Sequence, residues 1–196
     1  MAAVTKKEYF AYDFTNVHWH VANNDGTKEK GTLLGEFSQF EGETTTKTIV
    51  RNVEGNTAEQ VSKPSFAEGK IKGHFLVSTL RKLFGFTTDG LKAGVWAYGS
   101  SSQTANFALT ADERDMYENK HLIAFPNMAV TGGFSWSLEN GSEEVAEVEI
   151  PVKAMLDADK QLRYDMFGDE VEDQSLATKW HTDFSTELVK EPTQTP

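Results

Sequence analysis

Alternation of apolar and charged side chains with a period of two is the feature that most restricts the fold of this chain. It is clearest over residues 145–156, where five apolar residues share one parity and three charged residues share the other: Ala146, Val148, Ile150, Val152 and Ala154 against Glu147, Glu149 and Lys153. Alternate residues of an extended strand point to opposite faces of a sheet. The pattern therefore predicts an antiparallel sheet that is buried on one face and solvated on the other.

Shorter stretches rich in aromatic and β-branched residues occur along the rest of the chain. We expect strands over residues 9–21, 32–40, 70–77, 93–98, 122–125, 128–130 and 134–138. A single short helix is predicted at about 78–84, with Ser78 as its N-cap and Gly85 as its stop, and residues 110–114 resemble a helix start. The expected fold class is mainly β: an antiparallel β-sandwich or partial barrel with one short helix packed on a sheet.

Two segments differ in character from this β pattern. Residues 41–68 are polar with few candidate core residues, and a loop of this length is uncommon unless it is functional or disordered. We predict a long projecting arm here, with a β-hairpin in which residues 46–50 form one side. Residues 1–167 are predicted to form one β-sandwich domain. Residues 168–196 are predicted to form an acidic C-terminal extension, flexible in part, with Trp180 and Phe184 as isolated anchors.

The chain is acidic, with a net charge of −11 over 196 residues, and the charge is unevenly placed. Residues 1–138 hold 14 Lys and Arg against 15 Asp and Glu, whereas residues 139–196 hold 5 against 15. An acidic chain is repelled by phosphate groups, which disfavours conventional nucleic-acid binding. The absence of cysteine excludes thiolate metal sites and cysteine nucleophiles. No apolar run approaches the roughly 18 residues of a membrane span, so we expect an unsecreted protein with no membrane insertion.

Residue patterns that would support catalysis or cofactor binding are weak. His18 and His20 share a strand face at a spacing that metal sites use, but no third ligand follows nearby, and a solvated or partly packed face is the simpler interpretation. Glu147 and Glu149 also share a face, as a pair of carboxylates for glycoside hydrolysis would, but a solvent-facing charged strand explains them without any catalytic role and is the simpler interpretation. Nucleophile-elbow, P-loop and Gly-x-Gly-x-x-Gly motifs are absent. We therefore predict no catalytic residues, no metal and no cofactor.

Short motifs follow one another in a characteristic order over about residues 9–167. They are Asn16-Val17-His18, Gly35-Glu36-Phe37-Ser38, Glu41-Gly42-Glu43, Glu68-Gly69-Lys70-Ile71-Lys72-Gly73, Leu83-Phe84-Gly85-Phe86, Gly133-Phe134-Ser135-Trp136-Ser137 and Glu143-Glu144-Val145. In this order the chain resembles the major tail proteins, or tail tube proteins, of long-tailed phages that infect Gram-positive bacteria. Phe84 departs slightly from the family's spacing before Gly-Phe, and residues 168–196 lie outside the resemblance.

The resemblance implies a structural virion protein that polymerises as stacked hexameric rings into a tail tube and conducts DNA into the host. Its implied location is the virion tail, after assembly in the host cytoplasm. The implied partners are further copies of itself, the tape measure, tail terminator and distal tail proteins, and genomic DNA that passes through the lumen without specific binding. The arm would reach the next ring or a neighbouring subunit, with Thr46, Thr48, Ile49, Val50 and Arg51 as candidate contacts.

A tube that conducts DNA needs a wall that repels phosphate. Glu147 and Glu149 are the first candidates for lumen-facing carboxylates, but strand parity does not distinguish the lumen from an outward solvated face. An alternative function is a β-sandwich carbohydrate-binding module with Trp19, Trp96 and Trp136 as its platform. Against it, the alternating patterns around Trp96 and Trp136 predict that both indoles are buried.

Overall fold

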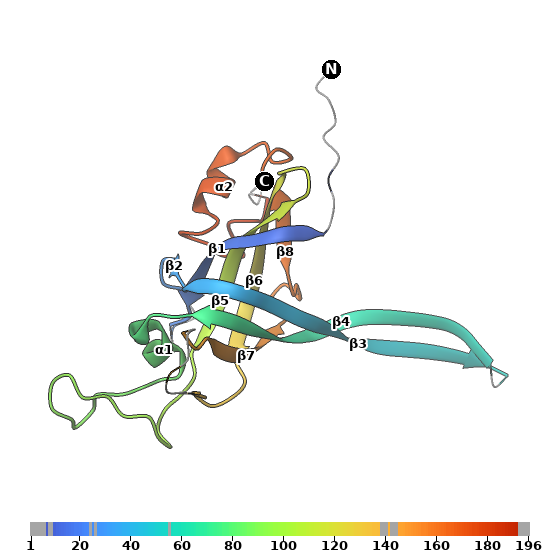
Figure 1. The fold of residues 1–196 in the computed structure, drawn as a ribbon. Helices are drawn as coiled ribbons and strands as arrows, with labels where there is room; N and C mark the ends of the chain where they lie inside the picture. Colours follow the sequence, from blue (N-terminus) through green and yellow to red (C-terminus); the bar gives the residue numbers. More distant parts are fainter. Residues whose placement is uncertain are drawn as a thin grey trace.

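The described residues form eight β-strands in one antiparallel sheet, together with two short helices (Figure 1). The computed structural model describes residues 7, 10–23, 25, 27–54, 56–137, 141 and 145–191. In chain order the elements are β1 (Ala11–Val21), β2 (Thr32–Leu33), β3 (Glu36–Val53), β4 (Asn56–His74), α1 (Val77–Leu83), β5 (Asn106–Asp115), β6 (Lys120–Val130), β7 (Val148–Met155), β8 (Tyr164–Phe167) and α2 (Gln174–Lys179). The predicted fold class, mainly β and antiparallel, is confirmed, and the sheet is open and does not close into a barrel.

The sheet divides along β6. Its strands follow the order β2-β1-β5-β6-β7-β4-β3, and β8 also pairs with β6. Residues 121–124 of β6 pair with β8, whereas residues 128–130 pair with β7 on the same side of the strand. The branch formed by β7, β4 and β3 carries a long hairpin away from the body (Figure 1).

Strand β1 contains an irregularity that its sequence requires. Its apolar residues change parity, from Phe10, Tyr12 and Phe14 to Val17, Trp19 and Val21. A regular strand would place these two sets on opposite faces. The pairing of β1 with β5 shifts between Thr15 and His18, and Asn16 adopts a left-handed φ of 55°. After this bulge the core residues are Val17, Trp19 and Val21, whereas Phe10 and Tyr12 before it are exposed.

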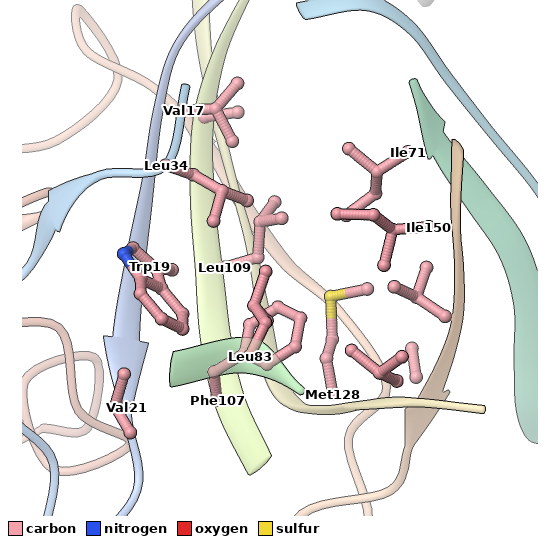
Figure 2. Close-up of a cluster of buried hydrophobic side chains, with 14 of the residues drawn as sticks. Val17, Trp19, Val21, Leu34, Ile71, Leu83, Phe107, Leu109, Met128 and Ile150 are labelled. Atoms are coloured by element: carbon pink, nitrogen blue, oxygen red, sulfur yellow. The ribbon is translucent and has the colours of Figure 1, made fainter. Parts of the chain in front are cut away.

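The main core fills the space between β1, β5 and β6 on one side and the β4–β7 pair on the other (Figure 2). Figure 2 shows Trp19 and Leu109 from one side and Ile71 and Ile150 from the other, with Met128 between them. In β7 the buried residues alternate as predicted: Ile150, Val152 and Ala154. The alternation over residues 145–156 thus identified the face of this strand that enters the core.

A second, smaller core lies on the other face of β5 and β6 and is closed by the C-terminal segment. Trp180 and Phe184 are each 1% exposed and pack with Ala108, Leu122 and Ala124. The indole Nε1 of Trp180 donates a hydrogen bond to the carbonyl oxygen of Ile123 at 3.0 Å. Residues 168–191 therefore lie on the sheet as a second layer, and this differs from the loose tail that their acidic composition suggests. The boundary at residue 167 stays a prediction.

Helix α1 forms close to its predicted position, but its first residues differ from the expectation. The N-cap is Leu76, which has no side-chain capping bond, and Ser78 lies inside the helix, so the prediction of Ser78 as N-cap was wrong. The predicted stop is confirmed. Gly85 has φ 65°, its N–H donates to Lys82, and the Phe86 N–H donates to Arg81 at 2.8 Å, which together form a Schellman motif.

Three local predictions were wrong. Residues 93–98 form a loop with a bridge between Thr87 and Ala97, and residues 134–137 of the strand predicted at 134–138 lie in no strand. Residues 110–114 belong to β5, because apolar residues on both faces of this strand are covered by the two cores. Residues 138 and 192–196, on which parts of the strand and extension predictions fall, lie outside the described residues. Neither helix in the described part of the chain has the length and apolar character needed to cross a membrane.

Candidate assembly site

The β3–β4 hairpin extends beyond the body of the protein (Figure 1). Strand β4 pairs with β7 only as far as Phe66, which lies opposite Met155, and from there to the tip β3 and β4 pair only with each other. All described side chains over residues 41–52 and 57–64 are exposed. The eight residues that follow Thr45 to the end of β3 extend about 25 Å. The hairpin thus projects where the sequence predicts an arm, and we call residues 46–64 the arm.

The arm holds its own register although neither face is buried. The run of threonines, isoleucine and valine in β3 favours extended backbone. Cross-strand contacts add to this: the Thr48 and Ser62 hydroxyls hydrogen bond at 3.0 Å, and Arg51 pairs with Glu59 at 3.3 Å. At the base, the Lys153 ammonium of β7 lies 3.6 Å from the centre of the Phe66 ring, a cation–π contact that ties the hairpin to the sheet.

Two glycines lie opposite each other near the base of the hairpin, where β4 still pairs with β7. Gly42 pairs directly with Gly69, so two of the motifs noted in the sequence meet across the strands. A Cβ on Gly69 would lie 2.1 Å from the Glu41 carbonyl oxygen and 2.9 Å from the Gly42 Cα. A Cβ on Gly42 has more room, with its nearest atom, the Glu68 carbonyl oxygen, at 3.4 Å. Close backbone approach therefore requires glycine at position 69 more strictly than at position 42.

Gly69→Ala is expected to lower the free energy of unfolding by about 1 to 3 kcal/mol, because the added methyl group collides with backbone that must shift. Gly42→Ala is its matched control, and we expect a cost of less than about 1 kcal/mol there, since the methyl group meets only a tight contact. Urea unfolding of both variants measures the difference. Equal losses at the two positions would contradict the close approach at Gly69.

The five predicted contact residues lie on two different faces of the arm. Between the register shifts at Thr45/Thr46 and Arg51/Asn52 the pairing is regular, so parity assigns the faces. Lys47 opposes Lys63, Ile49 opposes Val61 and Arg51 opposes Glu59 on one face, which we call the cationic face. The other, the neutral face, carries Thr46, Thr48, Val50, Gln60, Ser62 and Pro64. Ile49 and Arg51 are therefore separated from Thr46, Thr48 and Val50.

Residues of the return strand were missed by the sequence reasoning. Lys63 and Val61 of β4 complete the cationic face, and Val61 is 52% exposed, close to the 56% of Ile49 opposite it. Pairing a hairpin about its tip would have found them, because each residue of the first strand then selects one partner on the second.

The two predicted lumen residues lie on the solvated face of the β4–β7 pair, each in an ion pair. Glu149 contacts Lys70 and Glu147 contacts Lys72, both at 2.8 Å, and Glu68 contacts Lys153 at 3.0 Å in the same row. Hydrogen bonds from Lys72 and Ser38 lower the pKa of Glu147, so its carboxylate is ionised at neutral pH. The row contains three lysines and three glutamates, so Glu147 and Glu149 are locally neutralised. Their position toward a lumen stays a prediction.

The three tryptophans of the alternative carbohydrate platform do not form one surface. Trp19 is in the main core at 4% exposure. Trp96 and Trp136 are 41% and 71% exposed, so the prediction that both are buried was wrong, because neither lies in a strand. Trp96 is covered in part by the Arg81 guanidinium, 4.7 Å from its ring.

The predicted histidine pair acquires a neighbour from the C-terminal segment. The rings of His18 and His181 are 5.2 Å apart, and His181 uses both nitrogens, Nδ1 with Thr110 at 3.0 Å and Nε2 with Asp112 at 2.8 Å. Burial, with nearby Lys28, lowers the pKa of His20 to about 4. Among the residues that the structure describes, no group of three or more acidic or histidine side chains is arranged to hold a metal ion.

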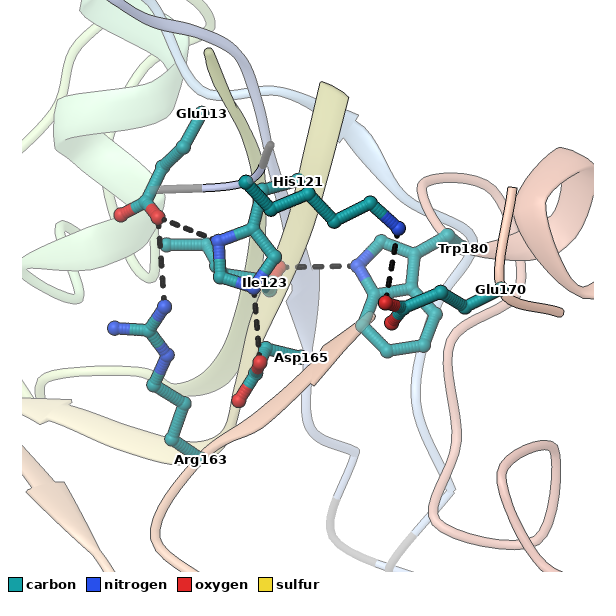
Figure 3. Close-up of polar contacts among 8 residues, drawn as sticks. Glu113, His121, Ile123, Arg163, Asp165, Glu170 and Trp180 are labelled. Atoms are coloured by element: carbon teal, nitrogen blue, oxygen red, sulfur yellow. Dashed lines mark hydrogen bonds and ion pairs between the residues drawn. The ribbon is translucent and has the colours of Figure 1, made fainter. Parts of the chain in front are cut away.

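A fourth histidine ties three strands together (Figure 3). His121 of β6 contacts Glu113 of β5 at 3.0 Å and Asp165 of β8 at 2.9 Å, and Arg163 reaches the same Glu113 at 3.4 Å. Burial would lower the pKa of His121, but the two carboxylates outweigh burial and raise it. Since both ring nitrogens are engaged, this cluster fastens β8 to the sheet.

Comparisons with known proteins leave the family open. No protein-family model matches the chain, and no curated protein matches it. Among solved structures, the chain is similar to the anti-feeding prophage cap, described as a tube terminating cap, with 13% identity and a TM-score of 0.41 over 85% of this chain and 99% of that one. A TM-score of this size does not establish a common fold.

Proposed function

We propose that this chain is a structural subunit that self-associates through its arm and builds the tube of a phage tail. The observation that carries the proposal is the hairpin itself, exposed on both faces beyond Phe66. An isolated two-stranded ribbon is marginally stable in water. A ribbon that projects about 25 Å with Ile49, Val50 and Val61 exposed is suited to packing against another molecule.

The free edge of β3 supports the same proposal. β3 is 18 residues long and is the last strand in the sheet order, and among the described strands it pairs only with β4. Long exposed edge strands invite pairing with another chain, and native proteins usually shorten or cover them. A contact between an arm on one copy and a different surface on the next is heterologous, and such contacts produce rings or filaments.

Further features of the proposal follow from the resemblance in sequence. They are hexameric rings stacked into a tube, a lumen lined in part by Glu147 and Glu149, and DNA that passes without specific binding. The proposed partners are the tape measure, tail terminator and distal tail proteins, and the proposed location is the virion tail. The ion pairs with Lys70 and Lys72 weaken the repulsion that Glu147 and Glu149 could exert on phosphate, because each pair has little net charge.

Replacement of residues 46–65 by Asn-Gly is expected to leave a folded monomer that has lost self-association. The change joins Thr45 and Phe66, which already lie opposite each other, by a two-residue turn of the kind that hairpins favour. Because the removed side chains that the structure describes are exposed or only partly buried, the thermal unfolding temperature should change by only a few degrees, on the order of the shift from 1 kcal/mol.

Sedimentation velocity over a concentration series, with negative-stain electron microscopy, measures the loss. Rings or tubes of the wild-type chain that disappear in the shortened variant support the proposal. A shortened variant that still assembles like the wild type, or a wild-type chain that never self-associates, would overturn it.

A further inference from the structure

The two faces of the arm differ in charge. The cationic face carries three basic residues, Lys47, Arg51 and Lys63, and one acidic residue, Glu59. None of the six residues of the neutral face carries a charge. A net positive face is unusual on a chain whose net charge is −11. The asymmetry indicates that the two faces do not meet the same surroundings.

Lys47 and Lys63 are the residues of the cationic face whose charges are not compensated. They lie directly opposite each other across the two strands, an arrangement of like charges that is unfavourable in a hairpin. Within the described residues, neither ammonium forms an ion pair, whereas Arg51 is paired with Glu59. Next to the two lysines, Ile49 and Val61 form an exposed apolar pair. The face therefore combines unpaired positive charge with apolar area.

We propose that the cationic face of the arm docks on an acidic surface of a second copy of this chain, with the neutral face turned outward. This inference rests on the proposed function and specifies the face and the chemistry of its contact. The complementarity is intrinsic to the chain, since copies with a net charge of −11 repel one another unless positive residues lie in the contact. Two lysines beside an apolar pair supply that attraction and an area to bury.

The neutral face has less need of a partner. Its Thr48 and Ser62 hydroxyls satisfy each other at 3.0 Å, and only Val50 is a large apolar residue there, at 45% exposure.

Two double variants with the same change in net charge test the choice of face. Lys47→Gln with Lys63→Gln removes two positive charges from the cationic face, and Thr48→Glu with Gln60→Glu adds two negative charges to the neutral face. Self-association is measured by sedimentation velocity at low and high salt. We expect the lysine variant to associate at least about tenfold more weakly and to lose most of its salt dependence. The association constant of the neutral-face variant should stay within about twofold of the wild-type value at physiological salt. At that ionic strength, charges more than roughly 8 Å from the contact are largely screened.

Each other outcome has a defined meaning. If only the neutral-face variant weakens association, the proposed docking face is wrong although the arm still mediates assembly. The same holds if neither variant has an effect while the Asn-Gly replacement of the arm does. If that replacement also leaves association unchanged, the proposed function itself fails. Binding of double-stranded DNA that the lysine variant loses while it still self-associates would overturn the proposal in favour of a nucleic-acid partner. Unchanged thermal unfolding and near-UV circular dichroism establish that both variants are folded.

Discussion

Trp180→Ala is expected to lower the free energy of unfolding by about 3 to 5 kcal/mol, the largest loss that we expect from any exchange of an aromatic residue for alanine in this chain. The indole is 1% exposed, packs edge-on against Phe184 at 5.1 Å, and donates a hydrogen bond to the Ile123 carbonyl oxygen. The substitution leaves a cavity between the sheet and the C-terminal segment and removes the donor for that oxygen. Urea or thermal unfolding measures the loss, which corresponds to a drop in melting temperature on the order of 10 °C.

Trp136→Ala is the matched control for this prediction. The same side chain is removed, but Trp136 is 71% exposed, so the cost should stay within about 0.5 kcal/mol. If Trp180→Ala cost no more than Trp136→Ala, residues 168–191 would not belong to the cooperative fold. Hydrogen exchange would then show the C-terminal segment opening independently of β5 and β6.

The elements that could be predicted from the sequence are those with an uninterrupted local pattern. Val148 to Ala154 alternate cleanly because β7 has one buried and one solvated face, and Gly85 ends α1 because only a left-handed residue completes its last turn. The hairpin was found by its polarity and its length. In these places local chemistry and tertiary position agree.

The C-terminal segment shows why the remainder could not be predicted. Its acidic composition indicates a tail, yet Leu176, Trp180 and Phe184 recur at a spacing of four, and Asp173 caps α2 by accepting a hydrogen bond from the Ser175 N–H at 2.9 Å. These signals were present in the sequence. The sequence does not show which surface this segment packs against. That surface consists of Ala108, Leu122 and Ala124, on strands whose opposite face lies in the main core.

For the candidate site, the sequence predicted where the arm lies along the chain but not which of its residues share a face. Thr46 to Arg51 were treated as one contact set, whereas strand parity divides them, and their cross-strand partners on each face are residues eight or more positions later. Glu147 and Glu149 were identified by parity, but their lysine partners on β4 are about 75 residues away in sequence, beyond what any local pattern reports. Trp96 and Trp136 were misjudged because loop residues can alternate by chance.

Asp112→Ala is expected to cost about 3 kcal/mol, because it removes a buried carboxylate and leaves the buried His181 without its acceptor. Asp112 is 5% exposed and accepts hydrogen bonds from His181 at 2.8 Å, Lys120 at 2.8 Å and Asn16 at 3.1 Å. It thereby joins the β1 bulge, β6 and the C-terminal segment at one carboxylate. Asp112→Asn keeps the shape of the side chain but removes its charge, so we expect a smaller loss.

The cost of Asp112→Asn should also depend on pH. Burial alone would raise the pKa of Asp112, but the hydrogen bonds from His181, Lys120 and Asn16 outweigh burial and hold that pKa below its ordinary value. A lowered pKa in the folded state stabilises the protein above the unfolded-state pKa of about 3.9, and this contribution is lost as the pH falls through the folded-state pKa. The difference in unfolding free energy between wild type and Asp112→Asn should therefore be full at neutral pH and shrink in acid. A difference that stays constant down to the acid transition would show that the three donors do not favour the ionised carboxylate, and that Asp112 acts only through its shape.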